Sequence, residues 1–158
     1  MEIERKFLID GFPPLPANHS AIIQQGYLCC SPVVRIRSKQ CGGQTSYRLC
    51  FKGKGTLVRE EIVLDIEKNV FLSLCSLLEG PLILKEWKTF PLADGLVLEC
   101  SHVDAGTPTS FYYAEVEFSS IEQANAFIPP SYLGKEVTED PSYSMSQYWL
   151  HTRQHHIE

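Results

Sequence analysis

The sequence predicts a mostly β protein in which eight antiparallel strands close into a barrel, with helices at the periphery. One observation behind this fold class is the alternation of apolar and polar residues, because side chains two apart on a strand share a face. Another is that the polar face of nearly every alternating stretch carries charged side chains. The predicted strands are residues 1–9, 21–30, 33–39, 45–52, 57–66, 82–90, 96–103 and 111–118.

Turn signals separate these stretches. The prolines between residues 10 and 20 forbid regular structure there, because proline fixes φ and lacks a backbone N–H. Gly42-Gly43 and Asp94-Gly95 are typical of tight hairpins between antiparallel strands. These signals therefore set the limits of the predicted strands.

Two segments change from the strand period to helical spacing. Apolar residues within 67–79 recur at helical intervals, and Gly80-Pro81 ends the pattern. A short helix is predicted within 119–128, and a further helix in the tail from Pro141, with Trp149 available for packing. These elements are expected to cover the outside of the barrel.

The charged strand faces have two interpretations. An open antiparallel sheet with one solvated face would produce them. A closed barrel explains them better, because about eight strands enclose an interior wide enough for one small ligand. The charged faces would then line the interior, and the apolar faces would pack outward against the helices and the tail. The eight basic and six acidic candidates are Lys6, Arg35, Arg37, Lys39, Arg48, Lys52, Arg59 and Lys85, and Glu2, Glu4, Glu61, Glu99, Glu115 and Glu117.

An interior with this composition favours phosphate chemistry. Buried charges are stable only when they are paired or bound to a ligand. Arg and Lys bind phosphate oxygens, and a separate carboxylate cluster can hold a divalent cation beside them. Mg²⁺ is the expected ion because it takes a few carboxylates together with phosphates and water, and Mn²⁺ is the alternative.

Length and composition limit the remaining classes. The 158 residues suffice for a single domain spanning 1–158, and a monomer or homodimer is expected. The net charge of −5 argues against a nucleic-acid partner. No apolar run suits a membrane-spanning helix, and the first residues lack a signal-peptide pattern.

The cysteines and tail histidines receive plain interpretations. The six cysteines lack C-x-x-C spacing, so we interpret them as free thiols in a reducing, cytoplasmic compartment. His151, His155 and His156 are interpreted as a solvated chain end rather than a metal site.

Short motifs follow one another in a recognisable order. Residues 2–6 read E-x-E-x-K, 25–28 read Q-G-Y-L, 34–37 read V-R-I-R, 59–61 read R-x-E, 114–118 read A-E-V-E-F, and 133–140 read L-G-K-E-V-T-E-D. In this order the motifs resemble the CYTH superfamily, the triphosphate tunnel metalloenzymes, and in particular its small bacterial members. The resemblance covers residues 2 to about 148, nearly the whole chain.

The resemblance implies an eight-stranded tunnel that hydrolyses an inorganic or organic triphosphate with Mg²⁺ or Mn²⁺. In many small bacterial members the substrate is inorganic tripolyphosphate, and thiamine triphosphate or a nucleoside triphosphate is an alternative. The resemblance also implies catalytic roles for Glu4, Glu61 and Lys85, with Glu61 orienting phosphate-binding side chains or helping to activate water. The implied phosphate-binding residues are Lys6, Arg35, Arg37, Lys52, Arg59 and Lys85. The implied metal ligands are Glu2, Glu4, Glu99, Glu115 and Glu117.

Five positions depart from the family pattern, namely Val63, Trp87, Ser101, Ser142 and Met145. Trp87 replaces an arginine, whereas Val63 and Ser101 replace acids, which favours a compensated change to a narrower and less charged tunnel wall. The departures also motivate an alternative in which the chain is a polyphosphate-binding domain that lacks turnover. A class IV adenylyl cyclase shares the fold and is a further alternative, although the sequence has no distinct nucleotide signature.

Overall fold

The computed structural model describes residues 1–153 and contains nine strands and three α-helices. The strands are β1 (Glu2–Ile9), β2 (His19–Cys30), β3 (Val33–Cys41), β4 (Gln44–Lys52), β5 (Val58–Arg59), β6 (Glu61–Asp65), β7 (Ile83–Pro91), β8 (Val97–Val103) and β9 (Phe111–Glu117). The helices are α1 (Lys68–Cys75), α2 (Ile121–Ala126) and α3 (Met145–Arg153), with short 3-10 turns η1 (Ala93–Gly95) and η2 (Pro141–Tyr143). His155 and His156, predicted to belong to a solvated end, lie outside the described residues.

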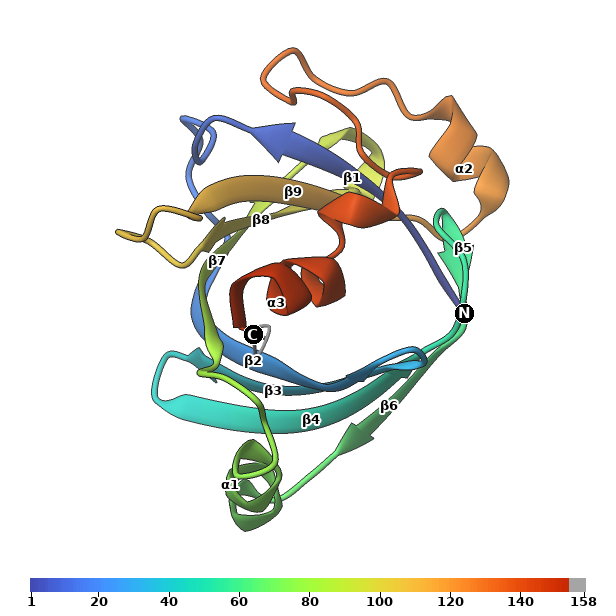
Figure 1. Ribbon diagram of the computed structural model, residues 1–158. Helices are drawn as coiled ribbons and strands as arrows, with labels where there is room; N and C mark the ends of the chain where they lie inside the picture. The colour runs from blue at the N-terminus through green and yellow to red at the C-terminus, as the bar shows by residue number, and fades with distance from the viewer. Residues whose placement is uncertain (154–158) are drawn as a thin grey trace.

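The sheet curves into a ring (Figure 1), with its strands in the order β5-β1-β9-β8-β7-β2-β3-β4-β6. Its two outer strands, β5 and β6, are separated by Glu60 alone. β5 pairs with β1 and β6 pairs with β4, both antiparallel, so one stretch of chain joins the two edges. The predicted barrel is confirmed. The predicted strand at 57–66 is divided in two because the chain changes partners at Glu60.

Local sequence explains where several elements begin and end. β3 runs on to Cys41, which leaves Gly42 and Gly43 as a two-residue hairpin, and Gly42 has a φ of 61° that glycine adopts easily. The first predicted helix is present but ends earlier than expected, at Cys75. α2 begins after Ser120, whose hydroxyl accepts a hydrogen bond from the Gln123 backbone N–H at 3.1 Å.

The outward face of β1, β8 and β9 carries the larger apolar core. Phe7, Leu98 and Val116 are at most 1% exposed and pack beneath α2 and the segment that follows it. Arg5 shares this apolar face of β1 and is satisfied by two sets of partners. Its guanidinium pairs with the Glu136 carboxylate at 2.6 Å and donates to the Ala124 carbonyl at 2.8 Å, at the end of α2. Arg5 therefore has a structural role outside the barrel.

The C-terminal helix does not pack where the sequence predicts. The tail was expected on the outside, but α3 lies within the ring of strands (Figure 1). Trp149 is fully buried against Tyr27 and Tyr113, whose side chains also line the barrel interior. The prediction was wrong because alternation marks the inner face of a strand but does not reveal that one end of that face is apolar enough to bury a helix.

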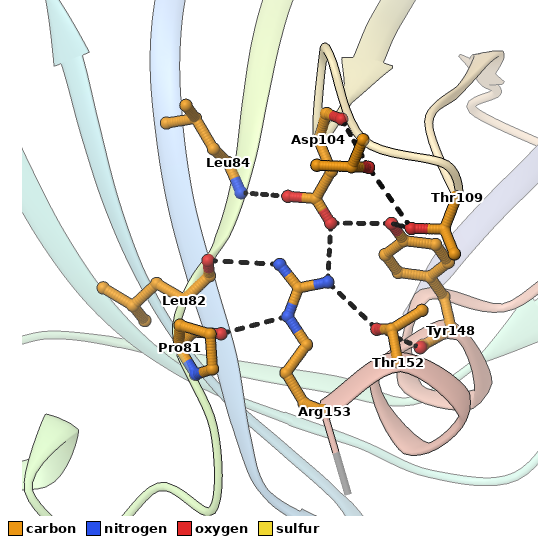
Figure 2. Close-up of polar contacts among 9 residues, drawn as sticks. Pro81, Leu82, Leu84, Asp104, Thr109, Tyr148, Thr152 and Arg153 are labelled. Carbon is orange, nitrogen blue, oxygen red and sulfur yellow. Dashed lines mark hydrogen bonds and ion pairs between the residues drawn. The ribbon is translucent and has the colours of Figure 1, made fainter.

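A buried ion pair holds α3 in this position (Figure 2). The Arg153 guanidinium lies 2.6 Å from the Asp104 carboxylate, and both side chains are at most 10% exposed. Arg153 also donates to the Pro81 carbonyl at 3.1 Å, while the Tyr148 hydroxyl donates to Asp104 at 2.6 Å. These bonds connect α3 to the start of β7 and the end of β8, so this end of the barrel is closed.

Two further observations concern the described residues as a set. No helix within residues 1–153 combines the length and apolar character needed to cross a bilayer. All six cysteines fall in the described part of the chain and are free thiols, as predicted.

Candidate active site

The barrel encloses a cavity of about 530 Å³, and nearly half of the residues that line it are charged. Alternation along each strand is the reason, because most of the residues of β1, β3, β4 and β9 that line the cavity are two apart in sequence. All twelve residues predicted for the site line this cavity: Glu2, Glu4, Lys6, Arg35, Arg37, Lys52, Arg59, Glu61, Lys85, Glu99, Glu115 and Glu117.

Half of the basic side chains predicted for the interior lie on β3 and β7, and the others lie on β1, β4 and β5. Lys85 is only 2% exposed, and burial, followed by the nearby Arg37, holds its pKa well below the ordinary value. Arg37 donates to the Gln25 side-chain carbonyl at 3.1 Å. The Nε atoms of Arg35 and Arg37 are buried without a partner in the described structure. Buried donors of this kind gain most from an anion that accepts their hydrogen bonds.

The acidic side chains form two close pairs on the opposite wall. The carboxyl groups of Glu4 and Glu115 are within hydrogen-bonding reach of each other, and so are those of Glu2 and Glu61. Burial, then the adjacent Glu115, raises the pKa of Glu4 well above its usual value. Burial, then the hydrogen bond with Glu61, raises the pKa of Glu2 to about 7. Each pair therefore tends to retain a proton that a cation could replace.

Lysines lie beside these carboxylates. The Lys52 ammonium is 3.2 Å from Glu2 and 3.4 Å from Glu61, so it bridges one acidic pair. Lys6 stands opposite Glu115 in the β1–β9 register and donates to the Tyr143 carbonyl at 2.6 Å. Basic and acidic walls thus meet along β1, which carries both Glu4 and Lys6.

The carboxylate pairs fit a hard divalent cation. Residues 1–153 contain no group of three or more His, Cys, Asp or Glu side chains that converge on one point. The five predicted ligands are therefore spread along the wall. Such an arrangement of carboxylates suits Mg²⁺ and Mn²⁺, because Mg²⁺ usually takes one or two carboxylates and completes its coordination with phosphates and water. Glu4 and Glu115 are the best-placed pair.

Glu99, Glu117 and Arg59 complete the predicted set, and only Glu117 of the three is exposed. Glu99 stands opposite Glu115 in the β8–β9 register, and burial, then the charge of Glu115, raises its pKa. Glu117 is exposed and stands opposite Glu4. Arg59 donates to the Gly53 carbonyl at 3.2 and 3.1 Å, which fixes its guanidinium at the edge of the cavity.

The departures from the family pattern fall into separate places. Trp87 and Ser101 face each other across β7 and β8, so these two changes are neighbours. Val63 lies on β6, and β2, β3 and β4 separate that strand from β7. The Lys39 ammonium lies 3.8 Å from the centre of the Trp87 ring, a cation–π contact. Met145 is buried at the start of α3.

Several lining residues were missed as site candidates. Gln25 accepts a hydrogen bond from Arg37 and donates one to the Tyr27 hydroxyl, and Tyr113 contacts two lysines. The signal was available for Tyr113, because it shares the inward face of β9 with Glu115. Residues within 137–147 also line the cavity. Strand periodicity does not predict this, because the segment is not a strand.

Comparison with known proteins identifies relatives of this architecture. No family model matches the chain. The inorganic triphosphatase of Nitrosomonas europaea is 38% identical over 143 residues, which cover 90% of this chain and 92% of that protein. The crystal structure of the inorganic triphosphatase NE1496 has a TM-score of 0.66 and 34% identity, and the match covers 95% of each chain.

A more distant structure shares the fold alone. It is a candidate adenylyl cyclase from Hippeastrum that is described as having a dominant triphosphatase activity. Its TM-score is 0.59 at 16% identity, and the match covers 79% of this chain and 83% of that chain.

Proposed function

Because the chain belongs to the CYTH superfamily of triphosphate tunnel metalloenzymes, we propose that it hydrolyses inorganic tripolyphosphate in the barrel lumen with Mg²⁺ or Mn²⁺. The observation that carries this proposal is the division of the cavity into two walls. One wall presents buried guanidinium and ammonium donors, and the other presents paired carboxylates. A condensed phosphate with a bound metal ion satisfies both walls at once.

The basic residues bind and orient the phosphate chain. Arg35 and Arg37 offer their unpartnered Nε donors to phosphate oxygens, and Lys85 adds a compact charge between them and β9. Lys6, Lys52 and Arg59 complete the phosphate-binding set. Fixed donors of this kind stabilise the charge that develops on the departing diphosphate without reorganising during the reaction.

The acidic residues bind the metal ion, orient the attacking water and accept its proton. Glu4 and Glu115 are the principal ligands in this proposal, with Glu2, Glu99 and Glu117 further along the wall. A bound Mg²⁺ or Mn²⁺ supplies neutralisation of phosphate charge and lowers the pKa of a coordinated water. Glu61, bridged to Glu2 by Lys52, orients the attacking water and accepts its proton.

Phosphate release from tripolyphosphate tests this function. Wild-type protein with Mg²⁺ or Mn²⁺ is expected to release phosphate, and Glu4→Gln is expected to lose at least a hundredfold in kcat because a metal ligand is removed. Tight tripolyphosphate binding without metal-dependent release would instead identify a binding domain. ATP incubated with the same metals, followed by chromatography, separates hydrolysis from cyclisation, and accumulation of cyclic AMP would contradict the proposal.

We also propose a cytoplasmic location, because six free thiols suit a reducing compartment. Redox-trapped labelling of the thiols in intact cells tests it, and disulfide-bonded cysteines in native protein would contradict it.

A further inference from the structure

One inward-facing tyrosine contacts two of the lysines in the basic wall. Tyr113 is 2% exposed and lies on β9, and its hydroxyl accepts a hydrogen bond from the Lys85 ammonium at 2.8 Å. Lys85 lies on β7, and β8 separates the two strands in the sheet. The contact therefore reaches across β8 inside the lumen. It depends on the length of the two side chains and not on the pairing of their strands.

The ring of the same tyrosine supports the second lysine. The Lys6 ammonium lies 4.2 Å from the Tyr113 ring centroid, over its face, while it also donates to the Tyr143 carbonyl. The ring face is electron-rich and attracts a cation. The phenol hydroxyl therefore binds the Lys85 ammonium, and the ring face lies nearer to the Lys6 ammonium than to that of Lys85, which is 5.4 Å from the ring centroid.

Tyr113 is itself fixed in place. Ser101 stands directly opposite it across β8 and β9 and is within hydrogen-bonding reach of its side chain. Its ring stacks on Phe111 at 5.8 Å and belongs to the apolar cluster around Trp149. The closed end of the barrel therefore provides a rigid base for this side chain.

The chemistry of the phenol differs from that of a carboxylate at the same place. Among residues 1–153, Lys85 makes no ion pair, and the Tyr113 hydroxyl is its hydrogen-bond acceptor. A carboxylate partner would orient the ammonium but would also neutralise it and repel phosphate. A phenol orients the ammonium and leaves its positive charge available to an anion.

We infer that Tyr113 is a positioning residue for the proposed hydrolysis, which holds the Lys85 and Lys6 ammonium groups toward the phosphate chain. The inference rests on the proposed function. Tyr113 itself does not contact the reacting phosphorus in this proposal, because the tyrosine hydroxyl and ring face are directed at the two lysines. Its effect must therefore pass through those lysines.

A double-mutant cycle tests this dependence. Tyr113→Phe removes the hydroxyl and keeps the ring, Lys85→Met removes the ammonium, and the pair is combined. Tyr113→Phe is expected to lower kcat/KM for tripolyphosphate about tenfold in the native background, which is the lower range for a hydrogen bond to a charged group. In the Lys85→Met background the same change is expected to cost less than twofold. Tyr113→Leu, which also removes the ring over Lys6, is expected to lose more than Tyr113→Phe.

Controls separate positioning from folding. Tyr112→Phe removes a hydroxyl from the neighbouring residue, whose ring packs outside the lumen on Phe12 and His102, and it should leave kcat/KM unchanged. A loss of equal size for Tyr113→Phe in both backgrounds, or no loss in either, would overturn the inference. If wild-type protein releases no phosphate, the proposed function fails, and the same cycle read as the Kd of tripolyphosphate still tests Tyr113, with the same expected ratios.

Discussion

Removing a member of an ion pair in the lumen is expected to stabilise the metal-free protein. Glu2 lies 3.2 Å from Lys52, which by itself would make Glu2→Gln destabilising. Burial and the proximity of Glu61 outweigh that attraction, because together they raise the pKa of Glu2 from 4.5 to about 7. The ionised carboxylate of Glu2 is therefore destabilised in the folded protein, and an amide of the same shape avoids this destabilisation.

The size of this stabilisation follows from the change in the pKa of Glu2. A pKa raised from 4.5 to about 7 corresponds to ~3.4 kcal/mol against the ionised form, and we expect about 2 kcal/mol after discounting for solvent screening at the cavity opening. The sign is set by proton binding. Between pH 4.5 and 7 the folded protein keeps a proton that the unfolded chain has lost, so stability falls with rising pH, and the full penalty is present above 7.

Urea unfolding in EDTA at pH 8 and at pH 4 is the assay. Glu2→Gln should raise the free energy of unfolding by about 2 kcal/mol at pH 8 and change it little at pH 4. Glu136→Gln is the matched control with the opposite sign, because the hydrogen bond from Arg5 lowers the pKa of Glu136 and its stabilisation is present above pH 4.5. An equal loss of stability for Glu2→Gln at both pH values would refute the reasoning.

Three other changes have defined outcomes. The Mg²⁺ concentration for half-maximal activity should fall as pH rises from 6 to 8, since metal competes with protons held by Glu2 and Glu4, and a flat titration series would contradict this. Trp87→Ala removes the ring beneath Lys39 and should raise KM for tripolyphosphate about threefold in steady-state assays, whereas an unchanged KM would exclude a role for this contact. Asp104→Ala leaves Arg153 buried without its partner and should lower the free energy of unfolding by about 3 kcal/mol in urea titrations, and a loss below about 1 kcal/mol would contradict the assigned role of the pair.

Strand periodicity predicted the wall of the site well. Charges at every second position of β1, β3 and β9 identify which side chains face inward, and a closed barrel is the arrangement that brings those faces together. Glu4 and Arg37 could be assigned to one cavity without knowledge of their distance for this reason. The resemblance to a family added the expected roles, which alternation alone does not supply.

Other features depend on tertiary contacts that no period encodes. Which face α3 covers is decided by the fit of Trp149 against Tyr27 and the ion pair of Arg153 with Asp104, and these residues are far apart in sequence. The contact between Lys85 and Tyr113 likewise passes across a strand. The partner change at Glu60 follows from closure of the sheet, so an uninterrupted strand was the natural prediction from sequence.

The central claim is that the two-walled lumen binds a triphosphate together with a divalent metal ion. A crystal structure with tripolyphosphate and Mn²⁺, with the ion located by its anomalous scattering, tests this most directly. We predict Mn²⁺ between the carboxylates of Glu4 and Glu115, and phosphate oxygens within hydrogen-bonding distance of the Nε atoms of Arg35 and Arg37. A triphosphate bound outside the barrel, or a metal ion away from these carboxylates, would contradict the claim.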